Sequence, residues 1–173
     1  MTAFDQAWAL VKMPIVPGSI ERVERPTWDD ANPHPWSHLE QSHNYPVGMW
    51  NAKFEHPDTG EIHPMQLRAM QSSRYYDAED RRPRFSGNIG YDDSRVVIAP
   101  QIYTEPESGK FVVTGVETKD EHRRKGMATA LYDMAAKILA NRRSRLMRTF
   151  DRQSPSAKGL WGDKTEWPVR DDL

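Results

Sequence analysis

The chain has 173 residues, a formal net charge of −1 and no cysteine. That length suits one domain with a substantial core, and the absence of cysteine excludes disulfides, thiolate nucleophiles and cysteine-bound metals. A charge so close to zero excludes a general binder of polyanions. No apolar run is long enough to cross a bilayer, and the first residues lack the pattern of a signal peptide. We therefore expect a cytoplasmic protein that does not associate with membranes.

The first 46 residues form a segment rich in proline and tryptophan. Apolar residues at helical spacing predict a short helix over residues 4–13, which Pro14 ends. The stretch from Pro14 to Pro46 holds six of the thirteen prolines, so we expect it to be extended and irregular. It either tethers the domain or wraps around it, and its tryptophans favour wrapping because disordered linkers contain few of them. We therefore divide the chain into residues 1–46 and a folded domain at residues 47–173.

Strand patterns dominate the first part of that domain. Residues 47–70 alternate between apolar and polar side chains and predict a hairpin, with its turn at Pro57-Asp58-Thr59-Gly60. Three further strands are expected at residues 85–91, 95–103 and 111–118. The last of these strands leads into the most informative segment of the chain.

A basic turn that contains glycine, Arg123-Arg124-Lys125-Gly126-Met127-Ala128, joins this strand to an amphipathic helix. Apolar residues recur at helical spacing from Met127 to Ile138 and are expected to face a core. Between them, Asp133 and Lys137 are expected to face water. Tyr132, on the same helix, is expected to be a packing or surface residue with its hydroxyl in water.

The start of this helix is suited to an anion. Its first backbone N–H groups have no partner inside the helix, and the helix dipole favours negative charge at that end. Gly126 has no Cβ, so a ligand can approach the main chain closely. Residues 119–164 also carry twelve Lys and Arg against five Asp and Glu. A strand, a turn and a helix with an ordinary solvated basic loop explain the same residues equally well from chemistry alone.

The segment resembles the acetyl-CoA-binding motif of the GNAT superfamily of N-acetyltransferases. The family motif has Gln or Arg, two variable residues, Gly, one variable residue, and then Gly or Ala. Arg123, Gly126 and Ala128 occupy its defined positions, and the resemblance covers residues 112–139. It implies an α+β fold with a mixed, mostly antiparallel central sheet flanked by helices, here preceded by the irregular Pro/Trp-rich segment.

The resemblance implies transfer of an acetyl group from acetyl-CoA to a primary amine. The acceptor would be a small molecule or a protein, and the enzyme a monomer or homodimer. The turn and the helix start would hold the pyrophosphate, and the backbone of the preceding strand would pair with the pantetheine arm. The cofactor-binding residues expected on this basis are Val116, Thr118, Arg123, Arg124, Lys125, Gly126, Met127, Ala128 and Thr129.

Catalysis also needs a base, because an amine is usually protonated at neutral pH. Glu117 is the carboxylate nearest to the cofactor strand; otherwise it is a plain polar strand residue. No metal site is expected. His34 and His38 have a spacing that can bind zinc on a helix, but Pro35 lies between them and no zinc motif accompanies them.

A further strand and helix are predicted near the end of the chain. Residues 145–150 suit a strand, and Ser154-Pro155 has the form of an N-cap followed by proline in the first helical turn. Trp161 stands where many GNAT proteins carry a tyrosine that acts as general acid. An indole cannot protonate a thiolate, so Trp161 is expected to be a core anchor.

Two other functions stay open. A cluster of arginines could track the phosphates of nucleic acid, which would suit a GNAT-like protein that acts on aminoacyl-tRNA or a nucleobase; a solvated helix face explains the cluster equally well. The cluster that could track phosphates runs from Arg142 to Arg152, and the solvated face would carry Arg142, Arg143, Arg145 and Arg148. Alternatively, the chain is a non-catalytic module that binds acyl-CoA. Fold analogy cannot choose the acceptor.

Overall fold

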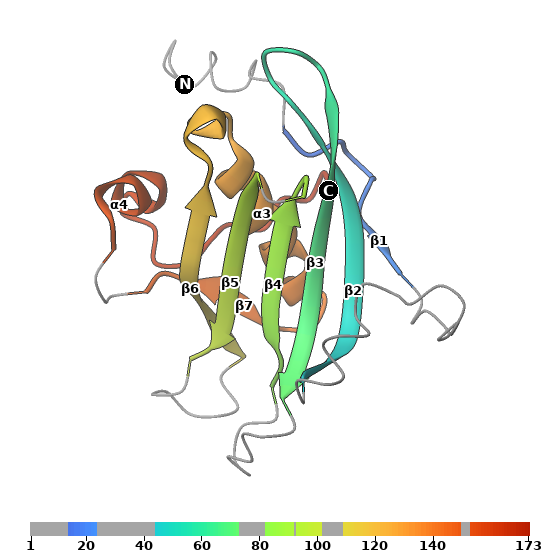
Figure 1. The fold of residues 1–173 in the computed structure, drawn as a ribbon. Helices are drawn as coiled ribbons and strands as arrows, with labels where there is room; N and C mark the ends of the chain where they lie inside the picture. Colours follow the sequence, from blue (N-terminus) through green and yellow to red (C-terminus); the bar gives the residue numbers. More distant parts are fainter. Residues whose placement is uncertain (1–13, 24–43, 73–81, 92, 102–108, 150–152) are drawn as a thin grey trace.

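A computed structural model describes residues 14–23, 44–72, 82–91, 93–101, 109–149 and 153–173. These residues form one curled seven-stranded sheet with two α-helices and a short 3-10 helix (Figure 1). The elements are β1 (Glu21–Arg22), β2 (Asn44–Glu55), β3 (Ile62–Ser72), β4 (Arg84–Ile89), β5 (Ser94–Pro100), β6 (Lys110–Thr118), η1 (Asp120–His122), α3 (Met127–Ala140), β7 (Arg145–Met147) and α4 (Pro155–Trp161). No described helix is both long and apolar enough to cross a bilayer.

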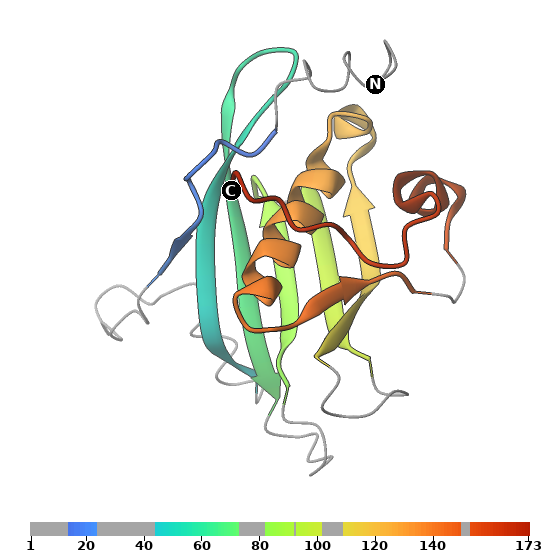
Figure 2. The ribbon, with the colours of Figure 1, turned by 180° about the vertical axis from the view of Figure 1, so that it is seen from behind.

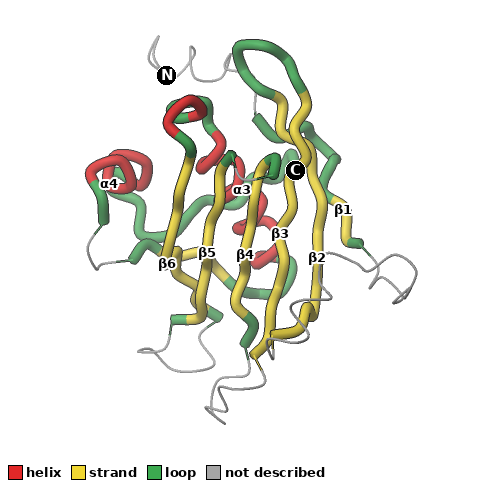
Figure 3. Tube along the Cα trace, in the orientation of Figure 1, coloured by secondary structure: helices red, strands yellow, loops and turns green. Residues whose placement is uncertain are grey.

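The strands lie side by side in chain order (Figure 3). Each neighbouring pair from β1 to β6 is antiparallel, whereas β6 and β7 are parallel. Helix α3 makes the connection between these two parallel strands, as a parallel pair requires a crossover. The expectation of an α+β fold with a mixed, mostly antiparallel sheet is therefore confirmed at this level.

Most of the predicted elements are present. The hairpin predicted at residues 47–70 corresponds to β2 and β3, and the strands predicted at 85–91, 95–103 and 111–118 correspond to β4, β5 and β6. The strand predicted at 145–150 is present as β7 and ends at Met147. Helix α4 begins as expected: the Ser154 hydroxyl accepts a hydrogen bond from the Ala157 N–H at 3.2 Å.

The core lies between the sheet and α3, which covers one of the two sheet faces (Figure 2). Alternation along β2 shows the two faces, since Ala52 and Phe54 are buried whereas Lys53 between them is exposed. No described helix lies over the face opposite α3 (Figure 1). We call the two sides the helix face and the outer face of the sheet.

The prediction that Asp133 faces water is wrong. Its residue exposure is 5 %, and its carboxylate accepts hydrogen bonds from the Trp167 indole at 2.8 Å and from the Arg170 guanidinium at 3.3 Å. Lys137 is only half-buried, and its ammonium donates to the Arg170 carbonyl at 3.4 Å. The chain after α4 crosses the side of α3 that faces away from the sheet (Figure 2). Helical spacing predicts the side of α3 that packs on the sheet, but not this second cover.

Residues 14–23 pack against the sheet. Ile15 is fully buried and forms an isolated bridge with Phe54, and β1 pairs with β2. The expectation of wrapping is confirmed for these residues. The helix predicted at residues 4–13 lies outside the described residues, as do residues 24–43. The division of the chain into residues 1–46 and 47–173 stays a prediction.

Candidate functional site

The junction between β6 and α3 carries backbone N–H groups for which no described group is an acceptor. Gly126 is the N-cap of α3 in the left-handed conformation (φ 82°), and the first bond of the helix runs from the Ala130 N–H to the Gly126 carbonyl at 2.9 Å. Within the described part of the chain, no group accepts a hydrogen bond from the backbone N–H groups of residues 124–129. Unpaired amides at a helix start, together with the helix dipole, favour an anion.

Two of the three basic residues of the turn have partners among the described residues. The Arg123 guanidinium forms an ion pair with Asp120 at 2.9 Å and also donates to the Thr118 carbonyl at 3.4 Å. The Lys125 ammonium forms an ion pair with Asp58 in the β2–β3 turn, and the hydrogen bond from Lys125 holds the pKa of Asp58 below its usual range. Arg124 has no partner among the residues that the structure describes. Among the described residues, nothing therefore competes with an anion for the Arg124 side chain.

The conformation of the turn depends on two residues with positive φ. Arg124 has a φ of 60°, which is uncommon for a residue other than glycine, and Gly126 has a φ of 82°. A Cβ on Gly126 would lie 3.4 Å from the Pro14 ring. One side of Gly126 thus faces the N-terminal segment, and a larger residue there would be strained by its φ while its Cβ made ordinary contact with Pro14.

The second feature of the junction is an open edge of β6. Strand β7 pairs only with Lys110, Phe111 and Val112, at the start of β6. Beyond them, residues 113–118 pair with β5, and no described strand pairs with their other edge. This open edge leads directly to η1 and the free amides of residues 124–129 (Figure 3).

A bulge in β6 decides which way the predicted site residues point. The register shifts so that Val97 pairs with Gly115 and Ile98 with Val113, and the extra residue, Thr114, has no pairing partner. Its hydroxyl donates to the Val97 carbonyl at 3.2 Å. Beyond the bulge the side chains alternate regularly.

Val116 and Thr118 lie on the helix face. They pair across the strands with Val96 and Ser94, which are fully buried on the same face. The hydroxyls of Thr118 and Ser94 are 2.8 Å apart. Glu117 lies on the outer face, where its side chain is 79 % exposed and its carboxylate is 3.8 Å from the Arg95 guanidinium. All three residues thus lie on the part of β6 that has the open edge, but the Glu117 side chain points away from the other two, and the Glu117 backbone carbonyl accepts a hydrogen bond from Ser94 of β5.

Trp161 is a packing residue, as expected. Its exposure is 1 %, and its ring lies 5.7 Å from that of Tyr132 and 5.1 Å from that of Trp167, between ring centroids. Tyr132 is also 1 % exposed, so its hydroxyl does not lie in water as expected. Burial raises the pKa of Tyr132 to about 12, against the smaller opposing effect of a hydrogen bond with Trp161. Neither side chain presents an acid to the open edge.

The sequence did not indicate a cluster around Asp93, in the β4–β5 turn. Its carboxylate lies 3.4 Å from His122, 3.5 Å from Lys119 and 3.8 Å from His63. These contacts hold η1, and with it the start of the basic turn, against the β4–β5 turn and β3. In the described ranges no group of His, Asp and Glu side chains is arranged to hold a metal ion.

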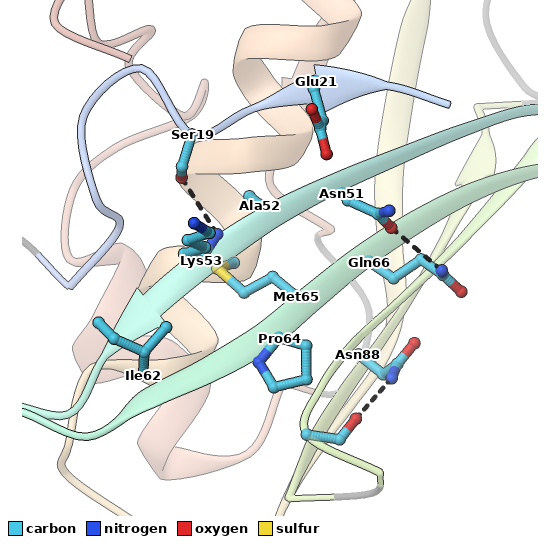
Figure 4. A pocket seen from close by; sticks show the side chains of 11 residues that line it. Ser19, Glu21, Asn51, Ala52, Lys53, Ile62, Pro64, Met65, Gln66 and Asn88 are labelled. Atoms are coloured by element: carbon cyan, nitrogen blue, oxygen red, sulfur yellow. Dashed lines mark hydrogen bonds between the residues drawn. The ribbon is translucent and has the colours of Figure 1, made fainter. Parts of the chain in front are cut away.

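The outer face carries a cavity of about 580 Å³ beside β1 (Figure 4). Its floor includes the carboxamides of Asn51, Gln66 and Asn88, and its rim includes Glu21 and Lys53. The sequence pattern placed none of these residues in a site, because only the pairing of β2, β3 and β4 brings them together.

Comparison of the chain with protein-family models, with curated proteins and with solved structures finds no match.

Proposed function

We propose that the protein is an acetyl-CoA-dependent N-acetyltransferase that transfers an acetyl group to a primary amine. The observation that carries this proposal is the meeting of the open β6 edge with the free amides at the start of α3. The open edge of β6 can pair with a chain that carries amides, and the N–H groups at the start of α3 can donate hydrogen bonds to a diphosphate. Coenzyme A has both groups, joined in that order.

The residues of the turn fit a diphosphate. The N–H groups of residues 124–129 are unpaired by described groups, and the exposed Arg124 lies among them. Gly126 keeps the main chain accessible on the side that Pro14 does not cover. Lys125 contributes less charge than its position in the motif implies, because Asp58 pairs with it.

The open edge of β6 fits the pantetheine arm. Backbone N–H and C=O groups near Val116 and Thr118 can pair with the amides of that arm, as a strand pairs with an added strand. A strand N–H can also stabilise negative charge that develops on the acyl oxygen. When bound, the cofactor supplies the activated thioester.

Glu117 is the proposed base. It lies on the strand that carries the open edge, and its exposed carboxylate can accept the proton that an acceptor ammonium must lose. It faces away from the helix face, so an amine would reach the open edge from the outer face of the sheet.

The first test is cofactor binding. Acetyl-CoA should raise the Tm by several degrees, because a ligand that binds the folded state stabilises it. Gly126→Glu should abolish this shift by placing a carboxylate at the anion site. Gly162→Glu is the matched control: Gly162 also has a positive φ (53°), and no atom lies within 4 Å of its Cβ position. No shift with the wild-type protein at millimolar acetyl-CoA would contradict the proposal.

Turnover separates an enzyme from a binding module. We expect acetyl transfer to at least one member of a broad amine panel, followed by release of free thiol. A Tm shift without transfer or hydrolysis would instead favour a non-catalytic module that binds acyl-CoA.

A second candidate function is action on nucleic acid, and it rests on Arg142. The Arg142 guanidinium lies over the Trp50 ring, 5.0 Å from the ring centroid, and burial, with a further effect of the Arg22 charge, lowers the pKa of Arg142. A guanidinium in this position can contact a phosphate. Binding of tRNA that weakens steeply with salt, and that Arg142→Ala reduces, would support this function.

A further inference from the structure

The cavity on the outer face has a polar floor built across three strands (Figure 4). Asn51 of β2 pairs with Gln66 of β3, and Gln66 pairs with Asn88 of β4. Their side chains point away from the helix face, because their neighbours Ala52, Met65 and Leu67 are in the core. Residues that are far apart in the sequence thus form one row of carboxamides.

These carboxamides are held in place by hydrogen bonds. The Gln66 amide donates to the Asn51 oxygen at 3.1 Å. The Asn88 oxygen accepts from Arg68 at 3.2 Å, and its amide donates to the Gly90 carbonyl at 2.9 Å. The Asn51 amide nitrogen and the Gln66 oxygen remain, with no described partner, as a fixed donor beside a fixed acceptor.

The other walls limit what can bind. Ile62 and Pro64 form an apolar side, and none of the described lining residues is aromatic. Glu21 and Lys53 on the rim carry opposite charges. The volume lies in the range typical of small-molecule sites. A neutral ligand with hydroxyl or amide groups fits these properties best.

The cross-strand row that contains the three carboxamides continues, with other residues, to the proposed catalytic strand. Asn88 pairs with Arg95 of β5, and Arg95 pairs with Glu117 of β6. Two strand spacings separate Asn88 from Glu117, about 10 Å at the Cα atoms. A ligand body in the cavity therefore lies on the same face as Glu117, within the reach of a short chain.

We propose that this cavity binds the body of the acetyl acceptor. That acceptor is a small molecule with a neutral body rich in hydroxyl or amide groups, and its amine lies roughly 10 Å from that body. The amine then meets Glu117 at the open edge of β6. This inference rests on the proposed acetyltransferase function, whereas the binding of such a body to the cavity can be tested without it.

The test is an NMR titration of the full-length, ¹⁵N-labelled protein with three probes at up to tens of millimolar. Glucosamine carries hydroxyls, glycylglycinamide carries amides, and spermidine carries charge alone. The side-chain amide signals of Asn51 and Gln66 should move with glucosamine or glycylglycinamide, and at least several-fold less with spermidine. Which of the two probes acts distinguishes hydroxyl from amide recognition.

A matched pair of variants locates the effect. Gln66→Leu should remove the probe-induced shift of the Asn51 amide. Gln101→Leu, the same substitution beyond the end of β5 and outside the cavity, should leave it unchanged. No shift with any probe, an equal shift with spermidine, or an unchanged shift in Gln66→Leu would overturn the proposal.

Failure of the cavity and failure of the proposed function give different results. Titration of the same sample with coenzyme A should move the backbone N–H signals of residues 124–129. If these signals stay while the Asn51 and Gln66 signals respond to the probes, the cavity binds a ligand but the acetyltransferase proposal is wrong. If coenzyme A shifts the backbone N–H signals of residues 124–129 but no probe shifts the side-chain amide signals of Asn51 and Gln66, the acceptor binds elsewhere.

Discussion

The Trp167 indole donates a hydrogen bond of 2.8 Å to the Asp133 carboxylate, which links the C-terminal segment to the middle of α3. Arg170 donates to the other carboxylate oxygen at 3.3 Å. The carboxylate is buried but has two donors, as a buried charge requires. Since α3 also begins at the candidate cofactor site, this link stabilises the helix on which that site depends.

Loss of this carboxylate should destabilise the fold. Asp133→Ala leaves the Trp167 indole and Arg170 without their buried acceptor, and we expect a loss of about 2–4 kcal/mol in the free energy of unfolding. Chemical denaturation measures this change. Asp163→Ala, at an exposed aspartate, should change the free energy by less than about 0.5 kcal/mol. Equal effects of the two substitutions would contradict the role of the buried link.

Asp133 should also make stability depend on pH. Burial raises its pKa, and the hydrogen bonds from Trp167 and Arg170 oppose that rise only in part. A carboxyl whose pKa is higher in the folded state binds its proton more tightly there than in the unfolded chain. Its contribution to stability is therefore largest below the ordinary aspartate pKa of about 4 and is lost as pH rises through the folded value.

The measurement is the free energy of unfolding of the wild type and Asp133→Asn as the pH falls from neutral. The variant cannot titrate at this position and serves as the control. The wild type should gain stability relative to Asp133→Asn on acidification. A relative loss would mean that the two hydrogen bonds outweigh burial.

Arg124 should contribute directly to cofactor affinity. It is exposed, has a positive φ and has no described partner, so its charge is available to a diphosphate. Arg124→Ala should weaken coenzyme A binding by about tenfold, the effect of one charge-assisted hydrogen bond. Arg143→Ala is the matched control, since Arg143 is exposed and has a φ of 57°. Titration calorimetry measures the affinity for coenzyme A. Wild-type affinity in both variants would contradict the assignment of Arg124 to the cofactor site.

Asp58 should limit the affinity for the cofactor. It pairs with Lys125 and so places negative charge beside the proposed diphosphate site. Asp58→Asn should tighten coenzyme A binding by roughly two- to fivefold, because the pair is partly exposed and its electrostatic effect is modest. The gain should shrink at high salt, where exposed charges are screened. Weaker binding by the variant would indicate that Lys125 needs Asp58 for its position.

Glu117 should affect turnover and not binding. Glu117→Gln should lower kcat by about 10²- to 10⁴-fold, the usual contribution of a general base, with coenzyme A affinity unchanged. Glu166→Gln, at an exposed glutamate beside β7, should retain full turnover. Wild-type kcat in Glu117→Gln would remove Glu117 from the mechanism.

Local structure was readable from the sequence where neighbours along the chain suffice to specify it. Alternation around Phe54 predicted the faces of β2, and the Ser154–Pro155 pair predicted the start of α4 through an N-cap bond that spans three residues. Helical spacing predicted the side of α3 that packs on the sheet. The same spacing misplaced Asp133, because its partners Trp167 and Arg170 lie more than thirty residues downstream.

The candidate site also has features that nearby residues specify and features that depend on residues distant in the chain. The strand, the glycine turn and the helix start are contiguous in the chain, and their order alone indicated an anion site. The chain pattern could not show that β7 leaves β6 after three residue pairs, that Lys125 meets Asp58, or that His63, Lys119 and His122 share Asp93.

Strands β2 to β7, the starts of α3 and α4 and the turn at Gly126 were predictable from the chain alone, because backbone geometry and side-chain periodicity act over a few residues; β1 was not predicted. The open edge of β6, the direction of the Glu117 side chain and the row of carboxamides became apparent only from the folded chain. Those features depend on the register between neighbouring strands, and register is set by the packing of the whole sheet on α3.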